Sequence, residues 1–301
     1  FKTRECMMSR IALFFVRLYG FLPWWVVRID AKVLAFLLTY VLRYRLTVIR
    51  QNLKLVGAKC VSEYGIYKNL CTLAFESLKL HSASVKSVDS RVSYENLDVL
   101  HELFAKGKNV VIVGGHMANW EMFSLSLPQN VEFKTYAVYK KLNNKTFDKA
   151  IRKSRSRAGM EIVEMNDLRS IVRDDSDMPK LISLVFDQRP LKPKTALWTE
   201  FLGVETPVYR GMEKIASMLD ASVVYAAIRR EKGGRYVMNL RLVEEDVLQN
   251  GELIDKCLGI LENEIVKAPE SWLWTHRRWK HIRPENVKLY ERKISKFEGW
   301  R

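Results

Sequence analysis

One histidine and one carboxylate stand out because of where the sequence places them. His116 follows a hydrophobic run and two glycines at residues 110–115, and Glu121 comes five residues later. An imidazole acts as a general base near neutral pH when a carboxylate accepts its N–H and leaves the other ring nitrogen to take a proton. No serine or cysteine lies between the two residues. The pair therefore suits direct deprotonation of an acceptor hydroxyl better than formation of a covalent acyl-enzyme.

The spacing of this pair sets a condition on the backbone. At about 100° per residue, a separation of five places His116 and Glu121 on different faces of one regular helix. The two side chains meet only if His116 lies before the helix and the chain folds back, which Gly114 and Gly115 permit. A carboxylate in the first helical turn is also stabilised as an anion. Taken alone, the spacing equally fits a histidine with a structural role.

The flanking residues predict the elements that hold this pair. Residues 110–113 are four consecutive β-branched side chains, typical of a strand buried on both faces of an α/β domain. Asn119 is a good N-cap for a helix over residues 120–127, which Pro128 ends. His116 is thus predicted at the carboxyl end of a strand, where α/β sheets bind their ligands.

A second strand exit carries polar side chains. The hydrophobic residues 181–186 lead into Asp187, Gln188 and Arg189, and Pro190 then forces a loop. A carboxylate, an amide and a guanidinium at a strand exit form a second candidate site. A loop that simply caps the sheet is the alternative.

The remaining pattern predicts an α/β fold with a mixed, mainly parallel central sheet flanked by helices. Lys232 and two glycines join the last two strands as a hairpin. Helices are expected at about 63–80, 95–105, 145–158, 212–219 and 254–267, and strands at 131–139, 161–164, 198–202, 222–229 and 235–244. No internal repeat or long linker divides residues 51–301, which we assign to one catalytic domain.

Residues 1–50 differ in composition from the catalytic domain. Leucine, aromatic and valine side chains dominate residues 11–42, but charged residues interrupt them, so no run reaches the roughly 18 to 20 residues of a spanning helix. Two helices separated near residues 20–23, followed by Arg43, Arg45 and Arg50, suit a membrane interface. We therefore predict a membrane-associated helical segment. A pair of buried core helices is the alternative.

The charge of the chain indicates anionic partners. The 50 lysines and arginines exceed the 34 acidic residues and give a formal net charge of +16. Phospholipid headgroups, phosphorylated substrates, an acidic carrier protein and nucleic acid all fit this charge. The chain contains no recognisable nucleic-acid-binding motif, so no nucleic acid is expected. A non-catalytic basic membrane or nucleic-acid binder is the alternative from another class of protein.

Four motifs then carry a resemblance. Residues 115–121 (Gly-His-Met-Ala-Asn-Trp-Glu), Asp187-Gln188, Phe-Leu-Gly at 201–203 and residues 274–280 (Trp-Thr-His-Arg-Arg-Trp-Lys) occur in this order. Together they strongly resemble the bacterial late acyltransferases of lipid A biosynthesis, the lauroyl/myristoyl type, within the glycerolipid acyltransferase superfamily. The resemblance covers nearly the whole chain.

The resemblance implies transfer of a fatty acyl group from acyl carrier protein to a hydroxyl of a lipid A precursor, a phosphorylated glucosamine lipid. The expected place is the cytoplasmic face of the bacterial inner membrane. His116 would be the general base and Glu121 its partner. Other acceptors, namely a lysophospholipid, an aminolipid or another glycolipid, stay open, and so do the acyl chain length and the oligomeric state.

Further residues take roles from the same resemblance. Arg155 and Asp187 match positions that the family uses in its active site, and we expect them to contact substrate together with Asn119, Gln188 and Arg189. A thioester is already activated, so the reaction needs a base, positioning and oxyanion stabilisation. Arg155, Arg189 or turn amides near residues 114–115 are the candidates for the last role. No cofactor or metal is expected, because ligands at zinc-binding spacing are missing.

Overall fold

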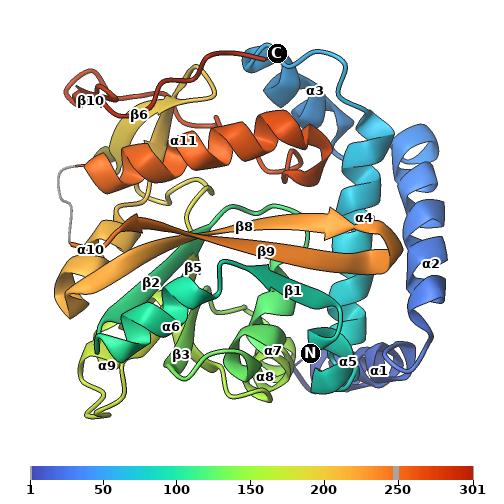
Figure 1. Ribbon diagram of the computed structural model, residues 1–301. Helices are drawn as coiled ribbons and strands as arrows, with labels where there is room; N and C mark the ends of the chain where they lie inside the picture. The colour runs from blue at the N-terminus through green and yellow to red at the C-terminus, as the bar shows by residue number, and fades with distance from the viewer. Residues whose placement is uncertain (1, 247–250, 301) are drawn as a thin grey trace.

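A seven-stranded sheet organises the structure, a computed structural model that describes residues 2–246 and 251–300 (Figure 1). All neighbouring strands run parallel except β8 and β9, which form an antiparallel hairpin. This confirms the predicted mixed, mainly parallel sheet. In spatial order the strands are β1 (Val92–Glu95), β9 (Arg235–Glu244), β8 (Ala221–Glu231), β2 (Asn109–Gly114), β5 (Lys180–Val185), β3 (Lys134–Tyr139) and β4 (Glu161–Glu164).

Strand β2 lies at the centre of this sheet, between β8 and β5. Val111 and Val113 belong to one hydrophobic core with α10 (Gly211–Leu219) and α11 (Glu252–Lys267). Val110 and Ile112 belong to a second core with α6 (Asp98–Ala105) and α7 (Phe123–Ser126). Figure 1 shows α11 and α6 on opposite faces of the sheet. The β-branched run is therefore buried on both sides, as its composition predicts, and gives His116 a rigid base.

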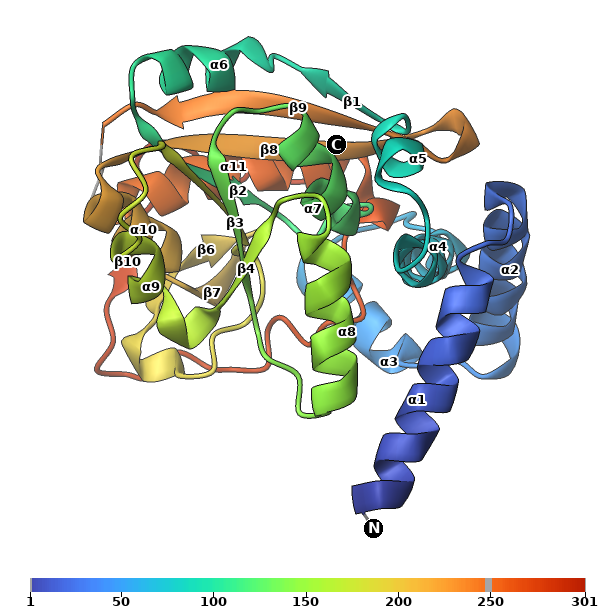
Figure 2. The ribbon, with the colours of Figure 1, turned by 90° about the horizontal axis from the view of Figure 1, so that it is seen from below.

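Helices lie across the end of the sheet toward which β2, β5 and β8 point. Figure 1 shows α4 (Glu63–Leu80) at the tip of β8, with α2 (Trp24–Phe36) outside it. α4 has the predicted bounds, because the Ser62 hydroxyl accepts the Gly65 N–H and caps its first turn. In Figure 2, α1 (Lys2–Tyr19) and α8 (Lys145–Ser156) extend to the same side of the molecule. The Asn144 side chain joins them by donating to Ser9.

Some elements differ from the prediction. The first residues assigned to the helix at 95–105 form β1 and a turn, in which Asn96 has a positive φ of 60°. The predicted helix at 120–127 is divided into η2 (Trp120–Met122), α7 and η3 (Leu127–Gln129). A strand and a helix that were not predicted also occur, β7 (Val204–Val208) and α3 (Leu46–Leu55). β7 pairs with β6 (Leu197–Phe201), and β10 (Leu289–Tyr290) completes a small second sheet.

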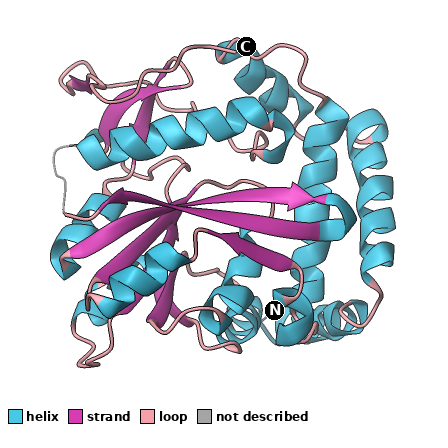
Figure 3. Ribbon diagram, in the orientation of Figure 1, coloured by secondary structure: helices cyan, strands magenta, loops and turns pink. Residues whose placement is uncertain are grey.

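Figure 3 distinguishes these helices and strands by colour. The remaining short elements connect the larger ones. They are η1 (Leu37–Val41), α5 (Val85–Asp89), η4 (Met165–Asp167), α9 (Arg169–Val172), η5 (Pro193–Thr195), η6 (Lys232–Gly234) and η7 (Pro269–Ser271).

The amino-terminal helices leave large apolar side chains exposed to solvent. The break predicted near residues 20–23 separates α1 from α2, as expected. Within residues 2–246 and 251–300, no helix is both long and apolar enough to cross a membrane. The exposed side chains include Phe14, Phe15 and Leu18 of α1, Trp25, Ile29, Val33 and Phe36 of α2, and Tyr40, Val41 and Leu42 that follow.

Candidate active site

The turn after β2 places His116 beside the neighbouring strand exit. Gly115 packs so tightly against Leu261 of α11 that a Cβ atom at this position would overlap the leucine side chain. Neither Gly114 nor Gly115 has a positive φ; the left-handed residue is Ala118, with φ 48°. The Ala118 N–H donates to the Ser271 carbonyl at 3.0 Å. Close packing, rather than the left-handed conformation, therefore explains why glycine precedes His116.

A buried carboxylate holds the His116 imidazole, and that carboxylate is Asp187. The imidazole Nδ1 lies 2.5 Å from Asp187 Oδ1, and the His116 backbone N–H donates to Oδ2 at 3.0 Å. The Trp272 indole N–H donates to the same Oδ2 at 2.7 Å. These contacts fix the imidazole orientation and leave Nε2 as the atom able to accept a proton.

The surroundings keep Asp187 ionised. Burial raises the pKa of its carboxyl, which is only 2% exposed. The charge of His116 and the hydrogen bonds from His116 and Trp272 outweigh burial and lower the pKa of Asp187 to about 2. An ionised carboxylate that accepts the Nδ1–H is the arrangement that makes an imidazole a good base.

Glu121, the predicted partner of His116, pairs with a different side chain in this structure. Glu121 forms a bidentate ion pair with Arg155 of α8, with N–O distances of 2.8 and 2.5 Å. Its backbone N–H donates to the Asn119 side chain, which caps the short helix η2. Because η2 starts immediately, Glu121 turns toward α8, while the parallel pairing of β2 and β5 brings Asp187 to the histidine. Arg155 is therefore paired with Glu121, and its contact with substrate stays a prediction.

Gln188 occupies the other side of the imidazole. Its Nε2 lies 3.0 Å from His116 Nε2, so the amide donates to the ring nitrogen that Asp187 leaves unprotonated. The Trp120 ring meets the imidazole edge-on, with ring centroids 4.5 Å apart. The imidazole is therefore enclosed by an amide, an aromatic ring and a carboxylate.

Arg189 and Asn119 have structural contacts. The Arg189 backbone N–H donates to His276 Nε2 at 3.3 Å. Burial, with Arg278 and Arg189 nearby, lowers the pKa of His276 to about 4, so this imidazole is neutral near pH 7. Asn119 is completely buried and donates to Glu76 at 2.8 Å. In this structure the Asn119 side chain supports the turn, and its contact with substrate stays a prediction.

A buried polar network behind the turn was not predicted. Glu76 of α4 accepts hydrogen bonds from Asn119 and, at 2.5 Å, from the Tyr236 hydroxyl. Arg230 donates to Tyr236 and to Asn69, and Asn69 donates to the Ser271 carbonyl. The network thus ties the turn after β2 to α4 and to the β8–β9 hairpin. A glutamate within an ordinary amphipathic helix gives no sequence signal for this role.

The backbone amides that directly follow the two glycines already have acceptors. The backbone N–H of His116 donates to Asp187, that of Met117 to the Gly115 carbonyl and that of Ala118 to Ser271. Met117 also forms a β-bridge with Trp272. Arg155, Arg189 and the Gly115 amide stay candidates for oxyanion stabilisation.

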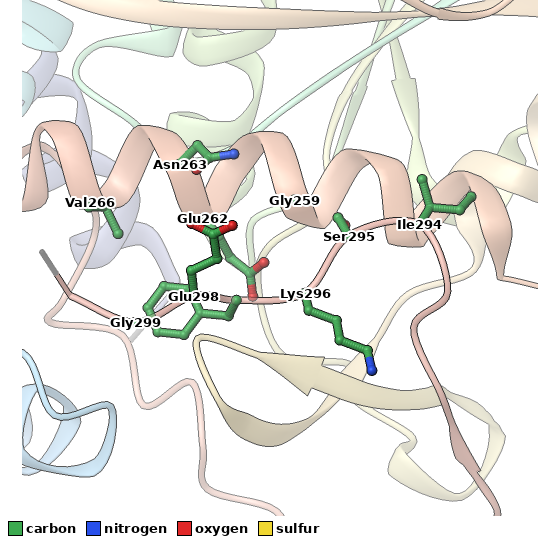
Figure 4. A pocket seen from close by; sticks show the side chains of 10 residues that line it. Gly259, Glu262, Asn263, Val266, Ile294, Ser295, Lys296, Glu298 and Gly299 are labelled. Atoms are coloured by element: carbon green, nitrogen blue, oxygen red, sulfur yellow. The ribbon is translucent and has the colours of Figure 1, made fainter.

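Two surface hollows lie outside this site. Figure 4 shows a cavity of about 450 Å³ between α11 and residues 294–299, lined among others by Glu262 and Lys296. A groove of about 410 Å³ follows α3 and is lined by Arg43, Arg50 and Lys54. No residue of the His116 site lines either hollow. The inner face of α3 nevertheless reaches the site, because Asn52 donates to the carbonyls of residues 274 and 276.

The fold and the geometry of the His116 site indicate the class of protein. An imidazole held by a buried carboxylate at the carboxyl end of a parallel strand is an arrangement typical of the catalytic sites of α/β enzymes. The sequence comparison identifies the group transferred. Residues 2–281 match the bacterial lipid A biosynthesis acyltransferase family, so the chain belongs to that family and is an acyltransferase.

Two curated relatives agree with this assignment. The lipid A biosynthesis palmitoleoyltransferase of Escherichia coli (strain K12) is 25% identical over 306 residues, which cover 92% of this chain and 95% of the relative. The lipid A biosynthesis acyltransferase of Shigella flexneri matches with the same identity and coverage. The chain therefore spans nearly the full length of these relatives.

Proposed function

We propose that this acyltransferase moves a fatty acyl chain from acyl carrier protein to a hydroxyl of a lipid A precursor, with His116 as the general base and Asp187 as its partner. The observation that carries the proposal is the pair formed by the imidazole and the buried carboxylate, 2.5 Å apart, at the exit of β2. The family supports the lipid A precursor as acceptor.

The chemistry follows from the two ring nitrogens. His116 Nδ1–H stays with Asp187, and Nε2 takes the proton of the acceptor hydroxyl as its oxygen attacks the thioester carbonyl carbon. A new C–O bond forms and the C–S bond breaks. The proton on Nε2 then passes to the departing thiolate, so the thiol leaves neutral and the base is regenerated.

Gln188 must move or share its place for this step to occur. Its amide nitrogen occupies the hydrogen-bonding position at Nε2, 3.0 Å away, that the acceptor hydroxyl takes in the reactive complex. An amide can instead bind the neighbouring oxygen of the same acceptor. We assign Gln188 the role of orienting the acceptor hydroxyl.

Arg155 and Glu121 form the second functional pair. Both side chains are partly buried, and their two-pronged contact holds the guanidinium in one direction. A guanidinium fixed by Glu121, five residues after the base in the sequence, fits stabilisation of the oxyanion or binding of a substrate phosphate. Glu121 thereby acts through Arg155, and its position five residues after the histidine is explained by that contact.

The amino-terminal helices fit attachment to a lipid surface, which supports action at the cytoplasmic face of the inner membrane. Exposed apolar side chains such as Phe14, Trp25 and Phe36 lie on α1 and α2, and Arg17 and Lys32 lie among them. Apolar side chains that enter the acyl boundary, with cations at anionic headgroups, are typical of helices that lie in a membrane interface.

Mass spectrometry of lipids from a deletion strain tests the acceptor. We expect lipid A that lacks one acyl chain, restored by the wild-type gene and not by His116→Ala. Unchanged lipid A together with an altered phospholipid or aminolipid would show that the acceptor is a different lipid. Unchanged lipids of every class would contradict the proposed reaction.

A further inference from the structure

A short segment near the carboxyl end of the chain contacts both strand exits of the active site. Residues 272–276 begin with Trp272, which forms an antiparallel β-bridge with Met117, directly after the base. At the other end of the segment, His276 Nε2 accepts the Arg189 backbone N–H at 3.3 Å. The segment therefore spans the exits of β2 and β5, where the groups of the site meet.

Trp272 is the residue of this segment that reaches the reacting pair. Its side chain is 2% exposed, and its indole N–H donates to Asp187 Oδ2 at 2.7 Å. The other oxygen of this carboxylate, Oδ1, lies 2.5 Å from His116 Nδ1. Among the described residues, these are the two side chains that hydrogen-bond to Asp187. One buried carboxylate thus joins the indole to the imidazole.

Neighbouring aromatic rings hold the Trp272 indole in one orientation. The Trp274 ring meets it edge-on with centroids 4.8 Å apart, the Phe201 ring lies 5.7 Å away and the Trp279 ring 5.9 Å away. Buried rings packed at these distances leave little room for rotation. The direction of the indole N–H is therefore fixed by packing, and it does not depend on the carboxylate that accepts it.

A fixed donor has two effects on this carboxylate. It stops Asp187 from turning about its last side-chain bond, so Oδ1 keeps facing His116 Nδ1. It also takes up part of the negative charge, which leaves less charge to stabilise a protonated imidazole. Burial raises the pKa of Asp187, but the charge of His116 and the hydrogen bonds from His116 and Trp272 lower it to about 2.

We propose that Trp272 is a positioning residue, whose indole N–H fixes Asp187 in the orientation that serves His116 and limits how strongly the carboxylate holds a proton on the base. The proposal rests on the proposed function, in which His116 is the base. The other charged or titratable groups around Asp187 are Tyr225, His276 and Arg278, which the substitutions below leave in place.

Two matched substitutions test this role. Trp272→Phe removes the indole N–H and keeps an aromatic ring in the cluster. Trp274→Phe is the control, because Trp274 is also buried and its N–H donates to the Pro269 carbonyl at 2.6 Å, away from Asp187. Both variants lose one buried hydrogen bond of an indole. Only the first loses a hydrogen bond to the carboxylate.

The measurement is kcat/KM against pH from 5 to 9, with purified acyl carrier protein substrate and lipid A precursor. In Trp272→Phe the carboxylate keeps more of its charge for the imidazole, so the protonated base is favoured. The acid limb should therefore move to higher pH by at least about half a unit. The acid limb of Trp274→Phe should stay in place. A folded Trp272→Phe protein with an unmoved acid limb would overturn the proposal, as would an equal movement in Trp274→Phe.

Nitrogen NMR of histidine-labelled protein gives a readout that needs no substrate. The pH at which His116 takes up a proton should rise in Trp272→Phe and not in Trp274→Phe, and His116→Gln identifies the signal. An unchanged titration in folded Trp272→Phe would contradict the proposal. If the wild type transferred no acyl group, the proposed function would fail, and the NMR comparison would still decide the role of Trp272.

A third measurement avoids the risk that Trp272→Phe does not fold. Trp120→Phe removes the indole that meets the imidazole edge-on, and it leaves Trp272 intact. In this variant, one indole N–H signal should still follow the protonation of His116, because the two rings share Asp187. That signal should not respond to pH after His116→Gln is added. If no indole signal follows His116, the proposal is overturned.

Discussion

Replacement of Asp187 by asparagine is the sharpest test of how the base is held. In the wild type, Oδ2 accepts the His116 backbone N–H at 3.0 Å and the Trp272 indole at 2.7 Å, and Oδ1 accepts the imidazole at 2.5 Å. Asparagine has one carbonyl oxygen. The two donors at the Oδ2 position select that oxygen, so the NH2 group faces His116 Nδ1.

The consequence can be worked out from this geometry. An NH2 group opposite Nδ1 forces the imidazole proton onto Nε2, and Nε2 then has no lone pair for the acceptor hydroxyl. General base catalysis contributes about 10²- to 10⁴-fold to rate, so kcat should fall by that factor, or about 3 to 5 kcal/mol in the barrier. Substrate binding does not use the lost proton transfer, so KM should change little.

The assay is acyl transfer from purified acyl carrier protein to a lipid A precursor at pH 7.5, followed by mass spectrometry. Asp220→Asn is the matched control, because Asp220 is exposed and its left-handed backbone, with φ 46°, suits asparagine. Glu121→Gln should also reduce activity, through Arg155. If Asp187→Asn kept activity within about fivefold while Glu121→Gln abolished it, the assignment of Asp187 as partner would be refuted.

Three other predictions concern the remainder of the chain. Burial raises the pKa of Glu264 to about 7, so the folded state holds this proton more tightly than the unfolded chain does and stability falls as pH rises from about 4.5 to 7. Between pH 5 and pH 8, the loss of unfolding free energy should be about 2 kcal/mol smaller in Glu264→Gln than in the wild type, as measured by urea unfolding. Arg292→Met should cost about 3 to 5 kcal/mol in unfolding free energy, because it leaves Asp255 and Glu262 buried and unpaired. Phe36→Asp should weaken sedimentation with anionic vesicles without lowering the melting temperature, because Phe36 is exposed.

Each of these three predictions has a result that would contradict it. A Glu264→Gln protein with the pH dependence of wild type would show that another group titrates. An Arg292→Met protein with wild-type stability would show that the two carboxylates take up protons at no cost. If Phe36→Asp bound vesicles as well as the wild type did, and a lysine-to-glutamate variant elsewhere lost binding, the lipid contact would lie outside α2.

Local sequence patterns predicted the central elements well. Four β-branched residues before two glycines indicate β2, and the apolar spacing with a serine cap indicates α4. The elements that were missed depend on tertiary contacts. β7 pairs back on β6 through a tight turn at Leu202 and Gly203, which have φ of 53° and 75°. In α3, Leu46, Ile49 and Leu53 are buried, whereas Arg50 and Lys54 on the other side are exposed.

The choice of carboxylate could not be read from local spacing. Glu121 is close in sequence to His116, but Asp187 is 71 residues away. The two strand exits become neighbours because β2 pairs directly with β5, although β3 and β4 intervene in the chain. The signal for the site was present in the polar residues after both strands. The order of the strands, which a single sequence does not provide, decides which of them meet.

The central claim is that His116 is the base of a direct acyl transfer. Its most direct test compares wild type and His116→Ala in single-turnover transfer from acyl carrier protein to the lipid A precursor. We predict that the alanine variant folds, binds both substrates and transfers acyl groups at least about 100-fold more slowly. Transfer by folded His116→Ala at the wild-type rate would contradict the account.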